Sequence, residues 1–192
     1  MKFHNKHILV VITIGFCSIL FILAFKNKRQ HEYFDVLSHM MSQSIDINVL
    51  NNCYMSSVSR QLLNEPVEFR FVVYIDSTEC TQCRLNHLID YLPFSSLLNT
   101  RSGQMLVVIE PKAYDTNFVR NFIDEYSEFP CILAVDGSFA KANTFIPSCK
   151  AFHNFFINKN NEVILVGDPT TNSAVDELFQ RRILCKNRKN TF

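Results

Sequence analysis

Two cysteines three positions apart are the residues of this sequence with the clearest chemical potential. Cys80 and Cys83 enclose Thr81-Gln82 and follow an apolar run that is typical of a strand, from which the four residues DSTE separate them. A cysteine at the start of the next helix would lie beside free backbone N–H groups and the positive end of the helix dipole, which favour a thiolate. The spacing also lets the second sulfur reach the first, so that a mixed disulfide can be resolved within the chain. The pair therefore predicts thiol–disulfide exchange, which needs no cofactor.

Strand and helix patterns alternate along the chain around this pair. Strands are predicted at 69–75, 105–109, 131–135, 152–157 and 163–166, the last two joined by an Asn-rich turn. Helices are predicted where apolar residues recur at helical spacing, at 85–92, 116–126 and 175–183. This order predicts an α/β fold, with a central mixed sheet covered by helices on both faces.

Three stretches resemble the thioredoxin superfamily. FVVYIDSTECTQCRL is similar to its strand, Cys-x-x-Cys motif and helix, whereas FPCILAVDGSFAKAN and FFINKNNEVILVGDP are similar to the distal half of its membrane-anchored TlpA-like branch. The resemblance covers residues 67–184 and implies a thioredoxin-like fold. It also implies that Cys80 is the attacking thiolate, that Cys83 is the resolving thiol, and that the partners are protein thiols or disulfides.

Two positions near the pair depart from the family pattern. Glu79 stands where an aromatic residue usually precedes the motif, and its carboxylate opposes formation of the Cys80 thiolate. Phe152 stands where a proline in cis usually precedes the strand that begins FFIN. In the family, the loop that contains this proline faces the redox pair and helps to bind partner peptides. The resemblance therefore implies that this loop is altered here, while the fold is unchanged.

Other polar residues leave an alternative function open. His153 lies in the loop expected to face the motif, where Cys80, Cys83 and His153 together could bind Cu(I) or Zn²⁺. The alternative is thus a thioredoxin-fold binding protein that holds a metal or a partner without turnover. On base rates His153 is instead a polar side chain at a strand start, His87 a solvated helix residue and Asp76 a loop acid or cap.

The composition narrows the partners and the setting. Seven cysteines among 192 residues are many for a reducing cytosol and favour an oxidising space. Cys131, within an apolar strand, is expected to be a buried small hydrophobe, although it could bridge to Cys149; Cys53 and Cys185 have no predicted pairing. A net charge of +1 gives no reason to expect a nucleic acid partner. Four glycines, without a GxGxxG or GxxxxGK pattern, argue against a phosphate-binding loop.

The N-terminal region predicts a membrane anchor. Residues 8–25 are uncharged and apolar, and as a helix they would span about 27 Å, close to the hydrocarbon core of a bilayer. No small-residue cleavage site follows, which favours an uncleaved anchor over a signal peptide. The cysteine content favours an extracytoplasmic domain, for example in a periplasm, although the flanking charges do not determine the orientation.

The predicted organisation therefore has four parts. Residues 1–29 form one transmembrane helix with its flanks, and residues 30–66 form a juxtamembrane segment with a helix at 30–41 and a short strand at 45–49. Residues 67–185 form the thioredoxin-like domain, and residues 186–192 form a basic tail.

Overall fold

The computed structural model describes residues 21, 23, 24, 26–126, 128–135 and 137–184, which fall into two compact units, Met1–Ser38 and His39–Phe192. Residues 26–40 are helical, as the pattern at 30–41 predicts. Within the described part of the chain, no helix combines the length and the apolar character needed to cross a membrane. The predicted anchor at 8–25 lies mostly outside the described residues and stays a prediction.

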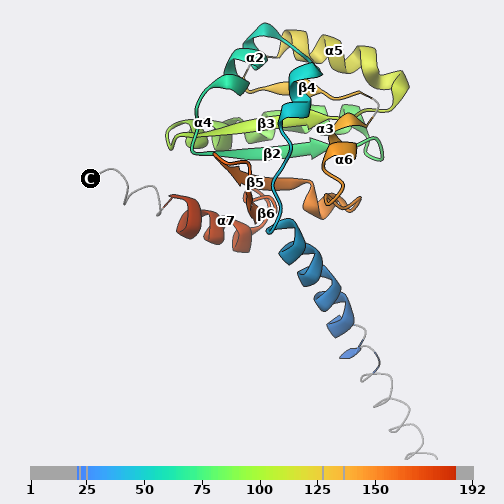
Figure 1. Cartoon of the computed structure of the whole chain (residues 1–192), viewed down its shortest axis with the longest axis vertical. Helices are drawn as coiled ribbons and strands as arrows, with labels where there is room; N and C mark the ends of the chain where they lie inside the picture. The colour runs from blue at the N-terminus through green and yellow to red at the C-terminus, as the bar shows by residue number, and fades with distance from the viewer. Residues whose placement is uncertain (1–20, 22, 25, 127, 136, 185–192) are drawn as a thin grey trace, which may run out of the picture. The chain divides into compact units, whose positions relative to one another are not determined.

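A mixed sheet forms the centre of the unit His39–Phe192 (Figure 1). The described strands follow the spatial order β1-β4-β3-β2-β5-β6. Their bounds are Tyr54–Met55 (β1), Phe69–Ile75 (β2), Gly103–Ile109 (β3), Cys131–Leu133 (β4), Asn154–Asn158 (β5) and Val163–Val166 (β6). β2, β3 and β4 run parallel, whereas β1, β5 and β6 pair antiparallel with their neighbours. The five predicted strands are present with shifted ends: β3 begins two residues earlier than expected, β4 ends two residues earlier, and β5 begins two residues later because Phe152 lies in a 3-10 helix.

Helices connect and cover these strands. The α-helices of this unit are α2 (Ser57–Asn64), α3 (Thr81–Asn86), α4 (Leu92–Asn99), α5 (Thr116–Glu125), α6 (Ser138–Ala142) and α7 (Ser173–Phe179). Short 3-10 helices lie at η1 (Asn48–Asn52), η2 (His87–Tyr91), η3 (Ala113–Asp115) and η4 (Lys150–Phe152), and a π-helical turn follows α7 at η5 (Gln180–Leu184).

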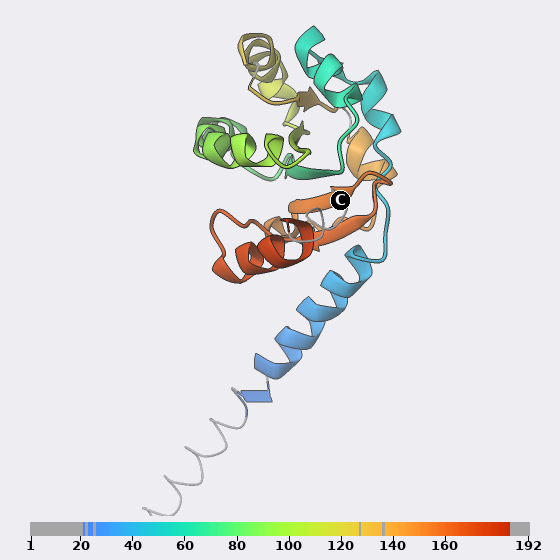
Figure 2. The same ribbon diagram turned by 90° about the vertical axis from the view of Figure 1, so that its left-hand side faces the viewer.

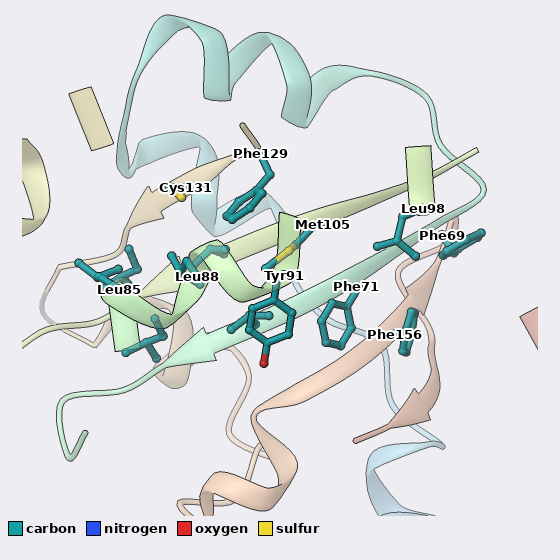
Figure 3. Packing of buried hydrophobic residues seen from close by; sticks show 14 of the residues in the cluster. Phe69, Phe71, Leu85, Leu88, Tyr91, Leu98, Met105, Phe129, Cys131 and Phe156 are labelled. Atoms are coloured by element: carbon teal, nitrogen blue, oxygen red, sulfur yellow. The ribbon is translucent and has the colours of Figure 1, made fainter. Parts of the chain in front are cut away.

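One face of the sheet carries the main hydrophobic core. The connections from β2 to β3 and from β3 to β4 cross the sheet in the same direction, so right-handed crossovers place α3, α4 and α5 on one face. Apolar residues of these helices pack in one cluster with alternate residues of β2 and with Phe179 of α7. Figure 3 shows Phe71 and Phe156 side by side in this cluster, with ring centroids 4.7 Å apart. Phe156 in turn stacks on Phe179 at 5.0 Å, which fastens α7 to the sheet.

The opposite face is covered by α2 and α6 (Figure 2). Arg70 of β2 donates a hydrogen bond to the Leu63 carbonyl of α2 at 2.9 Å. Tyr74 of β2 packs on Phe139 of α6, with ring centroids 5.3 Å apart. Helices therefore lie on both faces of the sheet, as the order of elements predicts.

The single helix predicted at 85–92 is wrong, because it is divided into α3, η2 and α4. Leu85 and Leu88 are buried as expected, but Ile89 is 62% exposed. Pro93 lies in the first turn of α4, where its missing N–H is tolerated but where it prevents one continuous helix from running through. The division turns the chain after the motif and places α4 along β3.

The strand predicted at 45–49 is also wrong. An isolated bridge from Ser44 to Glu162 precedes this stretch, and Asn48 begins η1. Asp46 accepts a hydrogen bond from the Asn48 N–H at 3.1 Å, and such a local bond competes with strand pairing. The sheet is instead extended by β1, which pairs with β4, so part of the segment before residue 67 belongs to the same compact unit as the motif.

Candidate functional site

The redox pair lies where the chain passes from β2 into α3. Cys80 is the N-cap of α3, and its Sγ accepts the backbone N–H of Cys83 at 3.3 Å. The two sulfurs are joined in a disulfide, with Cα atoms 5.3 Å apart. After reduction, a sulfur in this position would face a backbone donor and the positive end of the helix, both of which favour the thiolate.

Both cysteines are exposed. Exposure therefore does not distinguish an attacking sulfur from a resolving one. The position at the helix terminus distinguishes the two sulfurs. Cys80 is the N-cap and its sulfur accepts the Cys83 N–H, whereas Cys83 lies within the first turn of α3. The attacking role of Cys80 and the resolving role of Cys83, which the family resemblance implies, stay predictions.

Glu79, directly before the motif, is 5% exposed and lies between two basic side chains. Its Oε2 is 3.2 Å from Arg84 Nε, an ion-pair distance without the alignment of a hydrogen bond. Its Oε1 is 3.4 Å from His153 Nδ1. The carboxylate that was expected to oppose the Cys80 thiolate is thus held by groups from α3 and from the loop before β5.

His153 is 1% exposed and fixes that loop against the motif. Its Nε2 lies 2.9 Å from the Pro147 carbonyl oxygen, and its ring centroid is 4.9 Å from that of Tyr74. The preceding Phe152 is buried in η4 and its N–H donates to the Cys149 carbonyl at 3.0 Å. No cis peptide bond occurs among the described residues. The loop faces the motif as predicted, but through His153 instead of a proline.

The metal site considered at Cys80, Cys83 and His153 gains no support from the described residues. The sulfurs are joined to each other, and both ring nitrogens of His153 face other protein groups. Asp76, Glu79 and His153 do bring possible ligand atoms within 4.8 Å of one another. Since the Arg84 guanidinium already lies against Glu79, and Asp76 accepts two bonds from Thr78, we assign no metal to this group.

The side chains of His87 and of the described cysteines outside the motif take no part in the contacts around the redox pair given above. His87 is exposed and lies 3.0 Å from Asp90, as expected of a solvated residue. Cys131 is fully buried, and burial raises the pKa of its thiol. It is a free thiol, as are the exposed Cys149 and the buried Cys53, so the bridge considered between Cys131 and Cys149 is absent. Cys185 lies outside the described residues.

The sequence analysis missed a buried polar group beside the motif. Tyr74 donates to Glu110 Oε2 at 2.6 Å, and the Phe139 N–H at the start of α6 donates to Glu110 Oε1 at 2.6 Å. Burial and the bond to Glu110 raise the pKa of Tyr74. Tyr74 and Glu110 line a pocket of about 610 Å³, together with Asp76 and Ser77 from the loop between β2 and the motif. An acidic residue directly after a buried strand was the available signal for Glu110.

Comparisons with known proteins found similarity only to solved structures of low sequence identity. No family model matches the sequence, and neither does any curated protein. A thioredoxin-like protein from Bacteroides caccae is 15% identical over 63% of this chain and 43% of that chain, with a TM-score of 0.42. Peroxiredoxin Q from Xanthomonas campestris is 12% identical over 77% and 97% of the two chains, with a TM-score of 0.47. A putative thioredoxin from Neisseria meningitidis is 15% identical over 79% and 92%, with a TM-score of 0.46.

The strand order and the position of the disulfide define the class. A mixed sheet with helices on both faces carries a Cys-x-x-Cys disulfide at the start of the helix after β2. This arrangement is the thioredoxin-like fold that the sequence resemblance implies. The chain spans less than half of the Bacteroides caccae chain that it matches.

Proposed function

We propose that this protein is a thiol–disulfide oxidoreductase that exchanges disulfides with partner proteins through Cys80 and Cys83. The observation that carries the proposal is the exposed Cys80–Cys83 disulfide at the N-terminus of α3. An exposed disulfide can be reached by a partner thiolate, and the helix N-terminus stabilises the Cys80 thiolate formed when the bond opens.

The exchange follows from the positions of the two sulfurs. In the direction that reduces a partner, the Cys80 thiolate attacks a partner disulfide, forms a mixed disulfide and releases one partner sulfur as a thiolate. Cys83 then loses its proton and attacks the Cys80 sulfur, which breaks the mixed disulfide and releases the second partner sulfur. Two electrons pass to the partner and the pair becomes a disulfide. The two partner thiolates take up the proton that Cys83 loses and the proton that Cys80 had released to solvent when it ionised. The reverse sequence oxidises the partner.

The proposal includes a setting at the membrane. The apolar stretch 8–25 would tether the protein, in the manner of the TlpA-like branch that the distal half of the sequence resembles. The domain would then lie on the extracytoplasmic side. A cysteine-rich chain with a disulfide supports that side, since disulfides persist in oxidising compartments.

A thiol count by mass spectrometry in defined redox buffers tests the proposal. We expect the alkylated masses to show a reversible change of two thiols, located at Cys80 and Cys83. Cys149, an exposed free thiol, serves as the internal control and should be alkylated at every potential. A pair that stays in one state across the accessible potentials would contradict the proposal. So would a stoichiometric metal that protects both cysteines, which would favour the binding-protein alternative.

A further inference from the structure

Beside the redox pair, one departure from the family pattern meets the residue that follows the other departure. Glu79 replaces the usual aromatic residue, and His153 follows the position of the usual proline. They are 74 residues apart in the sequence, yet Glu79 Oε1 and His153 Nδ1 lie 3.4 Å apart in a buried site. Glu79 and His153 therefore form one structural unit.

The hydrogen-bond geometry indicates where a proton lies in this unit. His153 Nε2 is 2.9 Å from the Pro147 carbonyl oxygen, and a carbonyl can only accept, so Nε2 carries a hydrogen. In a neutral ring, Nδ1 would then present a lone pair to the Glu79 carboxylate. Facing lone pairs are unfavourable in a site this buried. One proton between Nδ1 and Oε1 removes the conflict, whichever of the two atoms it is bonded to.

The charges around the unit balance only with that proton. Glu79 and His153 together are then neutral. Asp76, with a ligand atom within 4.8 Å of both, contributes a negative charge, and Arg84, 3.2 Å from Glu79, contributes a positive one. The Tyr74 ring, which packs on His153, carries no charge because burial raises the pKa of its hydroxyl. The group of four charged side chains is neutral overall.

We propose that Glu79 and His153 hold one shared proton that cancels the carboxylate charge beside Cys80 and thereby sets how readily Cys80 forms a thiolate. This rests on the proposed function, in which Cys80 is the attacking sulfur. Both residues act through Cys80 and are positioning residues. The contact between Glu79 and His153 also holds the loop 147–153 against the motif. In this way it positions the loop that the proline positions in the family pattern.

Charge counting predicts a different result for each variant. Glu79→Gln removes the carboxylate, and the ring then releases the extra proton, so the group stays neutral. His153→Asn leaves the Glu79 carboxylate without the proton and makes the group negative. The double variant Glu79→Gln/His153→Asn is neutral again. Only the single His153 variant should therefore oppose the Cys80 thiolate.

The rate of Cys80 alkylation in the reduced protein, followed by mass spectrometry from pH 5 to 9, measures the thiolate directly. On the acidic side of the profile we expect His153→Asn to slow alkylation by about tenfold, with Glu79→Gln and the double variant close to wild type. His87→Asn is the matched control, since His87 is exposed and pairs with Asp90, and its profile should match wild type. Circular dichroism establishes that each variant is folded.

Other outcomes overturn the proposal. If the wild-type pair held no shared proton, with Glu79 charged and His153 neutral, His153→Asn would leave the profile unchanged and Glu79→Gln would speed alkylation. If His153→Asn does not fold, the Glu79→Gln result still decides between the two cases. Equal slowing in all three variants would indicate a purely structural role. A stoichiometric divalent ion lost in His153→Asn would place a metal where we place the proton. If the wild type exchanges disulfides but the alkylation profile of His153→Asn is unshifted, only the shared proton is refuted. If Cys80 and Cys83 never exchange disulfides, the proposed function is refuted.

Discussion

At the residue scale, buried polar groups beside the motif are matched to specific partners. Tyr74→Phe removes the hydroxyl that donates to Glu110 at 2.6 Å and leaves a buried carboxylate oxygen without that donor. We expect the free energy of unfolding to fall by about 1–3 kcal/mol, measured by urea denaturation. Tyr114→Phe is the control, because Tyr114 is 77% exposed, and it should change stability by less than about 0.5 kcal/mol. Equal effects of the two substitutions would contradict the role assigned to Glu110.

The cysteines outside the motif should differ in reactivity. Burial raises the pKa of the Cys131 thiol, so the folded protein holds that proton more tightly than the unfolded chain. The resulting stabilisation is present below the ordinary thiol range, about pH 8.5, and is lost as the pH rises above it. At pH 8, iodoacetamide should label the exposed Cys149 within minutes and Cys131 only after denaturant is added. Labelling of Cys131 in the folded protein would show that β4 opens.

At the element scale, the loop before β5 differs most from the family pattern. Phe152→Pro removes an N–H that donates to the Cys149 carbonyl at 3.0 Å and a buried aromatic ring. We expect Tm to fall by roughly 5–10 °C with no gain in activity, because His153 already fixes the loop. Lys150→Pro is the control, since Lys150 is the first residue of η4, where proline is better tolerated. A gain in disulfide reductase activity with little loss of Tm would instead show that this loop is a weakened proline loop.

Some elements could be predicted from the sequence and others could not. β2 was predicted to the residue because it is buried on both faces, which produces a continuous apolar run bounded by polar residues. β1 was missed because a two-residue strand is too short to show a period. The break between α3 and α4 was missed because Leu85 and Leu88 continue the apolar spacing across it, although Pro93 was a signal. These differences arise where tertiary pairing overrides the local pattern.

The sequence was enough to predict the cysteine pair of the candidate site, but not the contacts of the residues around it. The pairing of Cys80 with Cys83 could be predicted from their spacing after a strand, because the two residues are close in the sequence. The contact between Glu79 and His153 was not, since it joins residues 74 positions apart and depends on how the loop before β5 returns to the motif. Sequence alone placed Glu79 directly before the motif and His153 in the loop expected to face it, without linking the two residues.

At the scale of the whole molecule, the N-terminal segment should be separable from the redox unit. The chain divides into compact units after Ser38, so a protein that begins at Gln30 retains all of the second unit. We expect it to be soluble and to melt within about 3 °C of the full-length chain in detergent, by circular dichroism. Aggregation of the shortened chain alone would show that the apolar segment contributes to the fold.

Trapping of partners by single cysteine variants tests the central claim most directly. Cys83→Ser leaves Cys80 at the N-cap of α3 able to attack but unable to release, so mixed disulfides with partner proteins should accumulate. They should appear on non-reducing gels as bands that dithiothreitol removes, and Cys80→Ser, the matched control, should trap none. Suppose that Cys83→Ser forms no such adducts and that both variants lose a bound metal equally. This result would contradict the proposed oxidoreductase function and favour a metal-binding protein.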